Sequence, residues 1–397
     1  MSVRMNLGIY IQVPFCQTKC TYCNFHTGVF AKSLYGPYVD AVGRELRARG
    51  DTFATGGIRH SVDGQPPDSA GAAVDTVYIG GGTPSLLEPA ALARMLETLR
   101  AVFDCKLEEV TLEADPETIT AEKAAVWRGA GINRVSMGVQ SFNDVELMAA
   151  GRMHRRADVF EATRILRGAG FNNLSFDLIA GLPHQTAVSW ADSLDNLIQL
   201  RPEHVSIYLM EIDEGSRLGR EVLSGGHRYS AAALPDEDAM AGFYETACAW
   251  VAAARYEHYE ISNWALPGFR SRHNLKYWRR ESYLGVGAGA HSFDGCARWA
   301  NPHDPAAYVA AIQRGGLPAE QREVVTLQTA LDEELFLGLR QLEGIDVARI
   351  ERQYNASLRE RIARLEQAGL VEFDGTRLRL NPARLTVANE VFVELLG

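Results

Sequence analysis

The strongest constraint on the fold is an alternation of short apolar segments with longer amphipathic segments between residues 7 and 255. The short segments have the length of strands, and the longer ones carry apolar residues at helical spacing. Apolar strands separated by helices are typical of parallel sheets covered by helices. This pattern predicts an α/β fold, but it leaves open a partial (β/α)6 barrel, a complete barrel or a doubly wound sheet. The predicted strands span 7–13, 74–79, 109–113, 134–138, 173–179 and 204–209, and the helices 36–49, 89–102, 120–128, 144–149, 157–170, 187–200 and 234–255.

Polar residues, glycines or cysteines follow most of the predicted strands. Ligand-binding groups gather at the carboxyl ends of parallel strands, so these residues are expected to surround one pocket. The candidates are a cysteine-containing loop after the first strand, Gly80 to Thr83, Glu113 with Asp115, Gln140 and Asp177.

Several of these motifs also have simpler explanations. The three consecutive glycines that begin at Gly80 allow close approach of the backbone to a ligand, or they form a tight turn before Pro84. Glu113 is a hydrogen-bond acceptor for a ligand or part of a solvated acidic turn. Arg152 is suited to bidentate pairing with a carboxylate, or it belongs to a solvated basic turn.

Cys16, Cys20 and Cys23 follow the first strand at the spacing C-x3-C-x2-C. Thiolates this close in sequence can converge on a soft metal centre, and three of them on a [4Fe–4S] cluster leave one iron open. A structural zinc site needs a fourth ligand, which His26 could supply. Disulfides fit poorly because three cysteines are an odd number. The other cysteines are interpreted as buried small hydrophobic residues: Cys105, Cys248 and Cys296.

The stretch from Tyr10 to Phe25, with its three cysteines, resembles the radical SAM superfamily. Its sequence, IYIQVPFC followed by KCTYCNF, is similar to sequences of the branch that contains oxygen-independent coproporphyrinogen III oxidases (HemN-type) and HemW-type haem chaperones. The resemblance implies a partial (β/α)6 barrel and a [4Fe–4S] cluster on the three cysteines. It also implies that S-adenosylmethionine binds to the open iron. The positions that match cofactor contacts in this branch are Tyr10, Tyr22, Gly81, Gly82, Thr83, Glu113, Gln140, Arg152 and Asp177.

A basic, aromatic segment spans residues 270–280, with five basic residues, His273 and the pair Tyr277-Trp278. Haem needs an axial ligand, a flat apolar surface and cations for its propionates, and this segment offers all three. A basic surface turn with inward-packed aromatic residues is the alternative. The run from His273 to Trp278 resembles the H-N-x-x-Y-W signature of HemW-type chaperones, which implies haem binding with His273 as candidate ligand.

Three other segments depart from the strand–helix repeat. Residues 50–73 are rich in Gly, Ser, Asp and Pro and are predicted to form a surface loop, with a lid as the alternative. Residues 209–226 are predicted to form a loop. The glycine run 285–291 lacks the context of a dinucleotide-binding motif and is predicted to be a strand or loop packed closely against the pocket.

From about residue 321 the pattern changes to helices at 326–342, 346–354, 357–367 and 387–396, with a hairpin over 369–380. This order resembles a winged-helix-like α+β domain. The chain is therefore divided into a core at 1–235, a barrel-completing segment at 236–319 and a C-terminal domain at 320–397. From residue 320 onward there are 10 Arg, no Lys and 14 acidic residues, which argues against DNA binding by that domain.

Composition places the whole chain among ordinary globular proteins, with 46% hydrophobic residues and a net charge of −10. The negative charge argues against a general nucleic-acid partner. No apolar run reaches 18 residues and the N-terminus lacks a signal-peptide pattern, so we expect a cytoplasmic protein in which peripheral membrane contact stays open.

Within the resemblance, the expected function is a haem chaperone that binds haem and hands it to acceptor proteins. The main alternative is a coproporphyrinogen III dehydrogenase, and another radical SAM enzyme with a small substrate is a third. The dehydrogenase has a cysteine where this chain has Phe25, and it has a long extension where this chain has nine residues before Tyr10. Together with the segment at His273, these features favour the chaperone.

Overall fold

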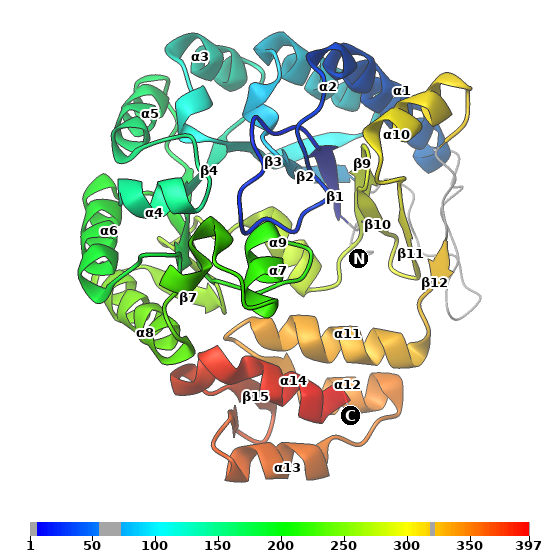
Figure 1. Ribbon diagram of the computed structural model, residues 1–397. Coiled ribbons are helices and arrows are strands. Elements are labelled where there is room, and N and C mark those ends of the chain that lie inside the picture. Colours follow the sequence, from blue (N-terminus) through cyan, green and yellow to red (C-terminus); the bar gives the residue numbers. More distant parts are fainter. Residues whose placement is uncertain (1–5, 55–72, 318–321, 397) are drawn as a thin grey trace.

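The computed structural model describes residues 6–54, 73–317 and 322–396. One large sheet runs through the molecule in the order β12-β11-β10-β9-β1-β2-β3-β4-β5-β6-β8-β7 (Figure 1). Its six central strands are parallel and follow one another in chain order. The sheet does not close, because β1 pairs with β9 and β6 pairs with β8. This topology confirms the partial barrel. The central strands are β1 (Asn6–Val13), β2 (Ala73–Gly81), β3 (Cys105–Ala114), β4 (Arg134–Gln140), β5 (Leu174–Ala180) and β6 (His204–Leu209).

Helices cover the outer face of these strands (Figure 1). α1 continues to Ala54, so the predicted loop begins later than residue 50, because the helical pattern persists past Gly50. The rest of that predicted loop, residues 55–72, lies outside the described residues. The expected loop at 209–226 is also wrong, since it contains α7 (Arg217–Leu223), which Ser216 caps. The outer helices are α1 (Tyr35–Ala54), α2 (Pro89–Val102), α3 (Ala121–Gly129), α4 (Asp144–Ala149), α5 (Arg156–Gly168), α6 (Ala187–Leu200) and α8 (Glu237–Ala253).

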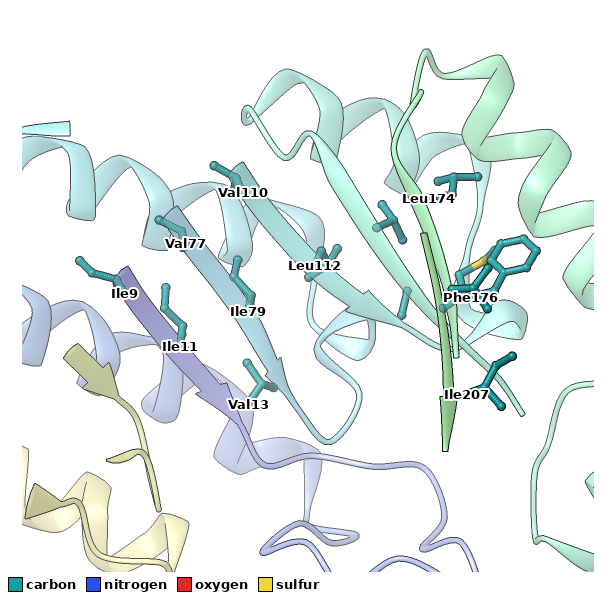
Figure 2. Packing of buried hydrophobic residues seen from close by; sticks show 14 of the residues in the cluster. Ile9, Ile11, Val13, Val77, Ile79, Val110, Leu112, Leu174, Phe176 and Ile207 are labelled. Atoms are coloured by element: carbon teal, nitrogen blue, oxygen red, sulfur yellow. The ribbon is translucent and has the colours of Figure 1, made fainter. Parts of the chain in front are cut away.

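The central strands have an apolar outer face and a polar inner face. Figure 2 shows Ile9, Ile11, Val77 and Ile79 extending from neighbouring strands on the same side, and all four are fully buried. Successive side chains of a strand point to opposite faces, so the residues between them face the barrel interior. Polar side chains such as Glu113 therefore point into the barrel interior, which no layer of the described helices fills in the way that helices cover the outer face.

The edges of the sheet contain strands that the sequence pattern did not reveal. They are short, with two to four residues each, and therefore carry too few residues to show a period. They are β7 (Glu257–Glu260), β8 (Asn263–Ala265), β9 (Tyr283–Val286), β10 (His291–Phe293), β11 (Ala297–Ala300) and β12 (Glu323–Val324), with α10 (Pro305–Gln313) between the last two.

The glycine run at 285–291 forms β9 and the turn into β10. A Cβ on Gly285 would lie 2.1 Å from the carbonyl oxygen of His291, so the close packing is confirmed. Gly287 has φ of +95°, which favours glycine. These glycines pack beside β1 and do not line the cavity described below, so their predicted place against the pocket is wrong.

α9 (Arg272–Trp278) carries the basic, aromatic segment and lies against the inner face of the barrel. Glu109 of β3, which is 4% exposed, accepts hydrogen bonds from the backbone N–H groups of Arg272 (2.9 Å) and His273 (3.2 Å). A carboxylate at a helix N-terminus satisfies orphan donors and interacts favourably with the helix dipole. Because Thr76, near the start of β2, contacts His273, α9 closes the amino-terminal end of the barrel.

The C-terminal domain packs against the open side of the barrel (Figure 1). Glu333 on α11 joins the two parts through Arg280 (2.9 Å) and Arg298 (2.8 Å). The predicted hairpin is confirmed by the antiparallel pair β14–β15. A third strand, β13, extends it to a sheet in the order β13-β15-β14, and its two residues are too few to show a pattern in the sequence. The domain contains α11 (Leu327–Arg340), β13 (Ile345–Asp346), α12 (Val347–Tyr354), α13 (Arg359–Gln367), β14 (Val371–Phe373), β15 (Arg377–Leu380) and α14 (Ala388–Leu396).

Cys105, Cys248 and Cys296 are half-buried rather than buried as expected, and Cys105 and Cys248 pack against the apolar core. Cys105 lies at the start of β3, where it pairs with Val74 of β2. Among the described helices, none combines the length and apolar character needed to span a bilayer.

Candidate functional site

A cavity of about 520 Å³ lies at the carboxyl ends of the parallel strands. Its size falls in the range of small-molecule sites. Most of the site residues predicted from the sequence line it, with the exceptions of Gly80, Tyr10 and His273. The predicted residues that line the cavity are Cys16, Cys20, Tyr22, Cys23, Gly81, Gly82, Thr83, Glu113, Gln140, Arg152 and Asp177.

The cysteine loop is held by backbone hydrogen bonds on both sides. Cys16 N donates to Gly28 O at 2.9 Å, which closes the base of the loop. Thr21 N donates to Ala150 O at 3.0 Å, and Leu218 N donates to Thr21 O at 2.8 Å. The β4–α5 segment and α7 therefore fix the tip of the loop against the cavity.

The three cysteine thiols are free, half-buried and close enough to affect one another. Burial raises the pKa of the Cys16 thiol to about 11, and the sulfurs of Cys23 and Cys20 add to the rise. Three neighbouring thiols of this kind can all be deprotonated only beside a cationic centre, which offsets the repulsion between the thiolates. Arg152 Nη1 lies 3.5 Å from Cys20 Sγ and supplies one positive charge.

A mononuclear zinc site fits this loop less well. Among the described residues, no three or more His, Cys, Asp or Glu side chains converge as ligands of one metal ion. The ring of His26 instead stacks on His303, with the ring centroids 4.0 Å apart. A mononuclear site needs all its ligands around one ion, whereas the cysteines of an iron–sulfur cluster can be spread around it. The donor set therefore fits the cluster better than zinc.

The glycine motif after β2 brings backbone close to the cysteine loop. Gly82 N donates to Val13 O at 2.8 Å, and a Cβ on Gly82 would lie 2.6 Å from Phe15 O and 2.9 Å from Cys16 Sγ. Gly81 has φ of +117°, and a Cβ there would lie 2.5 Å from Gln12 Nε2. Only glycine fits these two positions, which is a structural reason for the motif beyond a simple turn.

Glu113 is the acceptor of a small hydrogen-bond group. Its two carboxylate oxygens accept bonds from Gly81 N (2.8 Å) and Tyr78 O–H (2.9 Å). Burial nevertheless raises the pKa of the Glu113 carboxyl to about 7, and nearby Asp177 and Asp115 contribute to the rise. A ligand that brings a positively charged or donating group would restore the charged form.

The raised pKa of Glu113 predicts a pH effect on stability. A folded-state pKa of about 7, against an ordinary value of 4.5, means that the native protein binds the proton more tightly than the unfolded chain. The free energy of unfolding should therefore fall as pH rises from 4.5 to 7. Glu113→Gln should remove this loss, on the order of 3 kcal/mol, in urea unfolding of ligand-free protein at pH 5 and pH 8.

The matched control for this measurement is Glu108→Gln, which changes an exposed carboxylate on the same strand. The difference in free energy of unfolding between Glu108→Gln and the wild-type protein should be the same at both pH values. An equal pH dependence of Glu113→Gln and wild type would contradict the assignment.

Arg152 pairs with a carboxylate, as predicted. It forms an ion pair with Asp115, and its Nη2 also donates to Gly138 O at 2.9 Å. Asp115 in turn accepts from Thr83 O–H at 3.0 Å, so the ends of β2 and β3 are tied to the segment after α4. The contact to Asp115 uses Nη2 alone, so the bidentate pairing expected from the sequence is not formed. Nη1 lies beside Cys20 Sγ, and Nε donates to His154 Nδ1 at 3.4 Å.

Gln140, at the end of β4, and Asp177, in the middle of β5, line the cavity. Gln140 has φ of +63°, a backbone conformation that is costly outside glycine and is concentrated at functional sites. Asp177 accepts a hydrogen bond from Ser136 O–H at 3.2 Å, and burial raises its pKa. Both side chains keep further hydrogen-bonding capacity for a ligand.

Tyr10 lies on the inner face of β1, beneath the cavity rather than in its wall. Its hydroxyl donates to Gln12 Oε1 at 2.7 Å, and its ring stacks on Tyr78 with centroids 6.0 Å apart. Tyr78 lines the cavity, so Tyr10 supports that wall through one intervening ring.

His273 is 1% exposed and lies outside the cavity. Its Nδ1 is 3.0 Å from Thr76 Oγ1 and its Nε2 is 2.8 Å from Tyr277 O–H, so both ring nitrogens are engaged. Burial lowers the pKa of His273 to about 3, with Lys276 and Arg134 contributing. In this arrangement the ring offers no free nitrogen to a ligand in the cavity.

Sequence reasoning missed several cavity residues. Tyr78, Arg134 and Ser206 face the cavity from the inner side of strands, and their alternation with buried apolar residues was the available signal. Asn274, which follows His273, also lines it. Residues of the C-terminal domain, Leu385 and Phe392 among them, form another wall that no local pattern could reveal.

Comparison with known proteins agrees with this geometry. Residues 10–197 match the radical SAM superfamily, and residues 325–383 match the HemN C-terminal domain. The protein described as heme chaperone HemW of Bacillus subtilis is 33% identical over 98% of both chains. The HemW of Mycobacterium tuberculosis strain H37Rv is 35% identical over 98% of this chain and 95% of its own. The chain belongs to the HemW family of radical SAM proteins.

A solved structure shares the whole fold of this HemW-family chain. Coproporphyrinogen III oxidase (HemN) from Escherichia coli superposes with a TM-score of 0.81 over 99% of this chain and 90% of its own, at 22% identity. This likeness shows the fold, including the C-terminal domain, and extends no activity to the present chain.

Proposed function

We propose that this HemW-family protein is a haem chaperone, which binds haem and transfers it to acceptor proteins. The observation that carries the proposal is the near full-length similarity to proteins described as heme chaperone HemW. The cavity supports it, because it joins a cysteine loop to a wall with apolar residues in one enclosure.

We further propose that Cys16, Cys20 and Cys23 hold a [4Fe–4S] cluster and that the cavity holds S-adenosylmethionine. When bound, such a cluster supplies an open iron to which the amino and carboxylate groups of S-adenosylmethionine can attach. The glycines at 81 and 82 let the backbone of β2 approach that ligand, since a Cβ at either position would collide with neighbouring atoms. Glu113 accepts a hydrogen bond from a donor group of that ligand.

The remaining cavity residues position these groups. Arg152 stabilises a thiolate at Cys20 and fixes Asp115, which orients Thr83. Gln140 and Asp177 offer amide and carboxylate groups to the hydroxyl groups of a ribose. We propose a cytoplasmic location and the division at residues 235 and 319, although one sheet contains strands from both sides of each boundary.

A haemin titration tests the proposed function. The purified protein should give a saturable Soret band with one haemin per chain, and the bound haem should pass to an apo-acceptor such as a haem-free globin. His273→Ala tests the proposed ligand separately: a weaker and shifted band would show that the imidazole turns away from Thr76 and Tyr277 to bind the iron. Tyr277→Phe is the matched control, since it frees His273 Nε2 from its hydrogen bond and should bind haemin no less tightly.

An unchanged Soret band in His273→Ala would remove this residue as ligand but leave haem binding intact. Failure of the wild-type protein to bind haemin would contradict the chaperone. The same preparation, given coproporphyrinogen III, S-adenosylmethionine and reductant without oxygen, should form no protoporphyrinogen. Robust turnover there would favour the dehydrogenase instead.

A further inference from the structure

One wall of the cavity contains none of the residues assigned to the cluster or to S-adenosylmethionine. On the barrel side it consists of Tyr208, Leu209 and Met210, at the end of β6 and just beyond it. On the opposite side it consists of Leu385, Ala388 and Phe392, from the segment before α14 and from α14 itself. Two sequence-distant apolar surfaces thus enclose one space, which suits a flat apolar ligand.

A guanidinium group stands at this wall. Arg340, at the end of α11, lines the cavity and lies over the ring of Trp278, with the guanidinium carbon 4.6 Å from the ring centroid. Its Nη2 is 3.4 Å from Glu260 Oε2, while its buried Nε has no hydrogen-bond partner among the described residues. Stacking orients the planar group and leaves donor capacity for a carboxylate.

The aromatic segment around His273 therefore reaches the cavity through residues other than His273. Asn274 lines the cavity directly, and Trp278 acts on it by orienting Arg340. His273 itself is turned to Thr76 and Tyr277. The segment can therefore contact a ligand in the cavity without His273.

We propose that this wall binds the face of a porphyrin between β6 and α14, with a propionate directed to Arg340. The inference rests on the proposed function and specifies its binding site. The apolar side chains on both surfaces exclude water from the ring faces, and the guanidinium pairs with the carboxylate. Because the contacts are made to the ring and its propionates, an iron-free porphyrin binds at the same place.

The test uses a side chain on the cavity side of α14. Asn389 lines the cavity but is exposed, so Asn389→Trp fills the space without disturbing the core. The control is Val393→Trp, which adds the same ring to a position on α14 that is 73% exposed and is not part of the cavity wall. Thr386→Trp is a second blocking variant in the segment before α14. Far-UV circular dichroism and thermal unfolding establish that each variant is folded.

Haemin is titrated by its Soret band and protoporphyrin IX by its fluorescence. Asn389→Trp should weaken both affinities by at least about tenfold, while Val393→Trp should bind like the wild-type protein. Wild-type affinity of both blocking variants would overturn the inference and leave the chaperone function standing. Weakened haemin binding with unchanged protoporphyrin binding would also overturn it. Failure of the wild-type protein to bind either porphyrin would overturn the proposed function itself.

Discussion

Alanine at Cys16, Cys20 or Cys23 is expected to abolish the iron–sulfur absorption that the wild-type protein gains on anaerobic reconstitution. Three cysteines already leave one iron of a [4Fe–4S] cluster without a protein ligand, so a further loss leaves only two attachment points. The iron content should fall from about four per chain to near zero. Measurement of visible absorption together with iron and sulfide content checks the result.

The chain provides matched controls for this experiment. Cys105 and Cys248 are also free and half-buried, but neither lines the cavity. Cys105→Ala and Cys248→Ala should therefore retain full cluster content. A cluster that survives Cys20→Ala, or one that is lost in Cys248→Ala, would contradict the assignment of the cysteine loop.

Glu109→Ala is expected to produce the largest loss of stability at a residue outside the cavity. The buried carboxylate accepts hydrogen bonds from Arg272 N and His273 N, and its charge favours the buried guanidinium of Arg134. Its removal leaves buried donors unsatisfied and a cation without its nearby anion, which costs about 3–5 kcal/mol. Urea unfolding should show a lower midpoint with little change in slope.

Glu108→Ala is the comparison for this loss, because Glu108 precedes Glu109 on the same strand and forms an ion pair with Arg272 on the surface. Both partners are more than half exposed, so the loss should be about 0–1 kcal/mol. Equal losses in the two variants would show that Glu109 does not cap α9. A loss confined to Glu109→Ala would show that α9 depends on β3.

Prediction from the sequence succeeded where a pattern is local and long. α2, α4, α6 and β6 begin and end at the predicted residues. The cysteines, the glycine motif and the polar strand ends come together in one cavity, because parallel strands place their carboxyl ends along one edge. Arg152 was predicted to pair with a carboxylate and contacts Asp115.

Prediction failed where a residue's surroundings come from distant parts of the chain. His273, the candidate haem ligand, is buried outside the cavity, because Glu109 holds the start of α9 against the barrel and Thr76 and Tyr277 engage the imidazole. The two- to four-residue edge strands are formed by pairing with the existing sheet rather than by their own periodicity.

The sequence by itself predicted the parallel sheet, the cysteine loop and the order of polar groups along the strands, since the pattern behind each is carried by residues that are close in sequence. Only the tertiary structure decided that α14 forms a wall of the cavity and that His273 is buried beneath it. These outcomes depend on contacts between segments more than 100 residues apart, such as Thr76 with His273. Apolar burial drives such contacts without direction, so their partners appear only when the chain is packed.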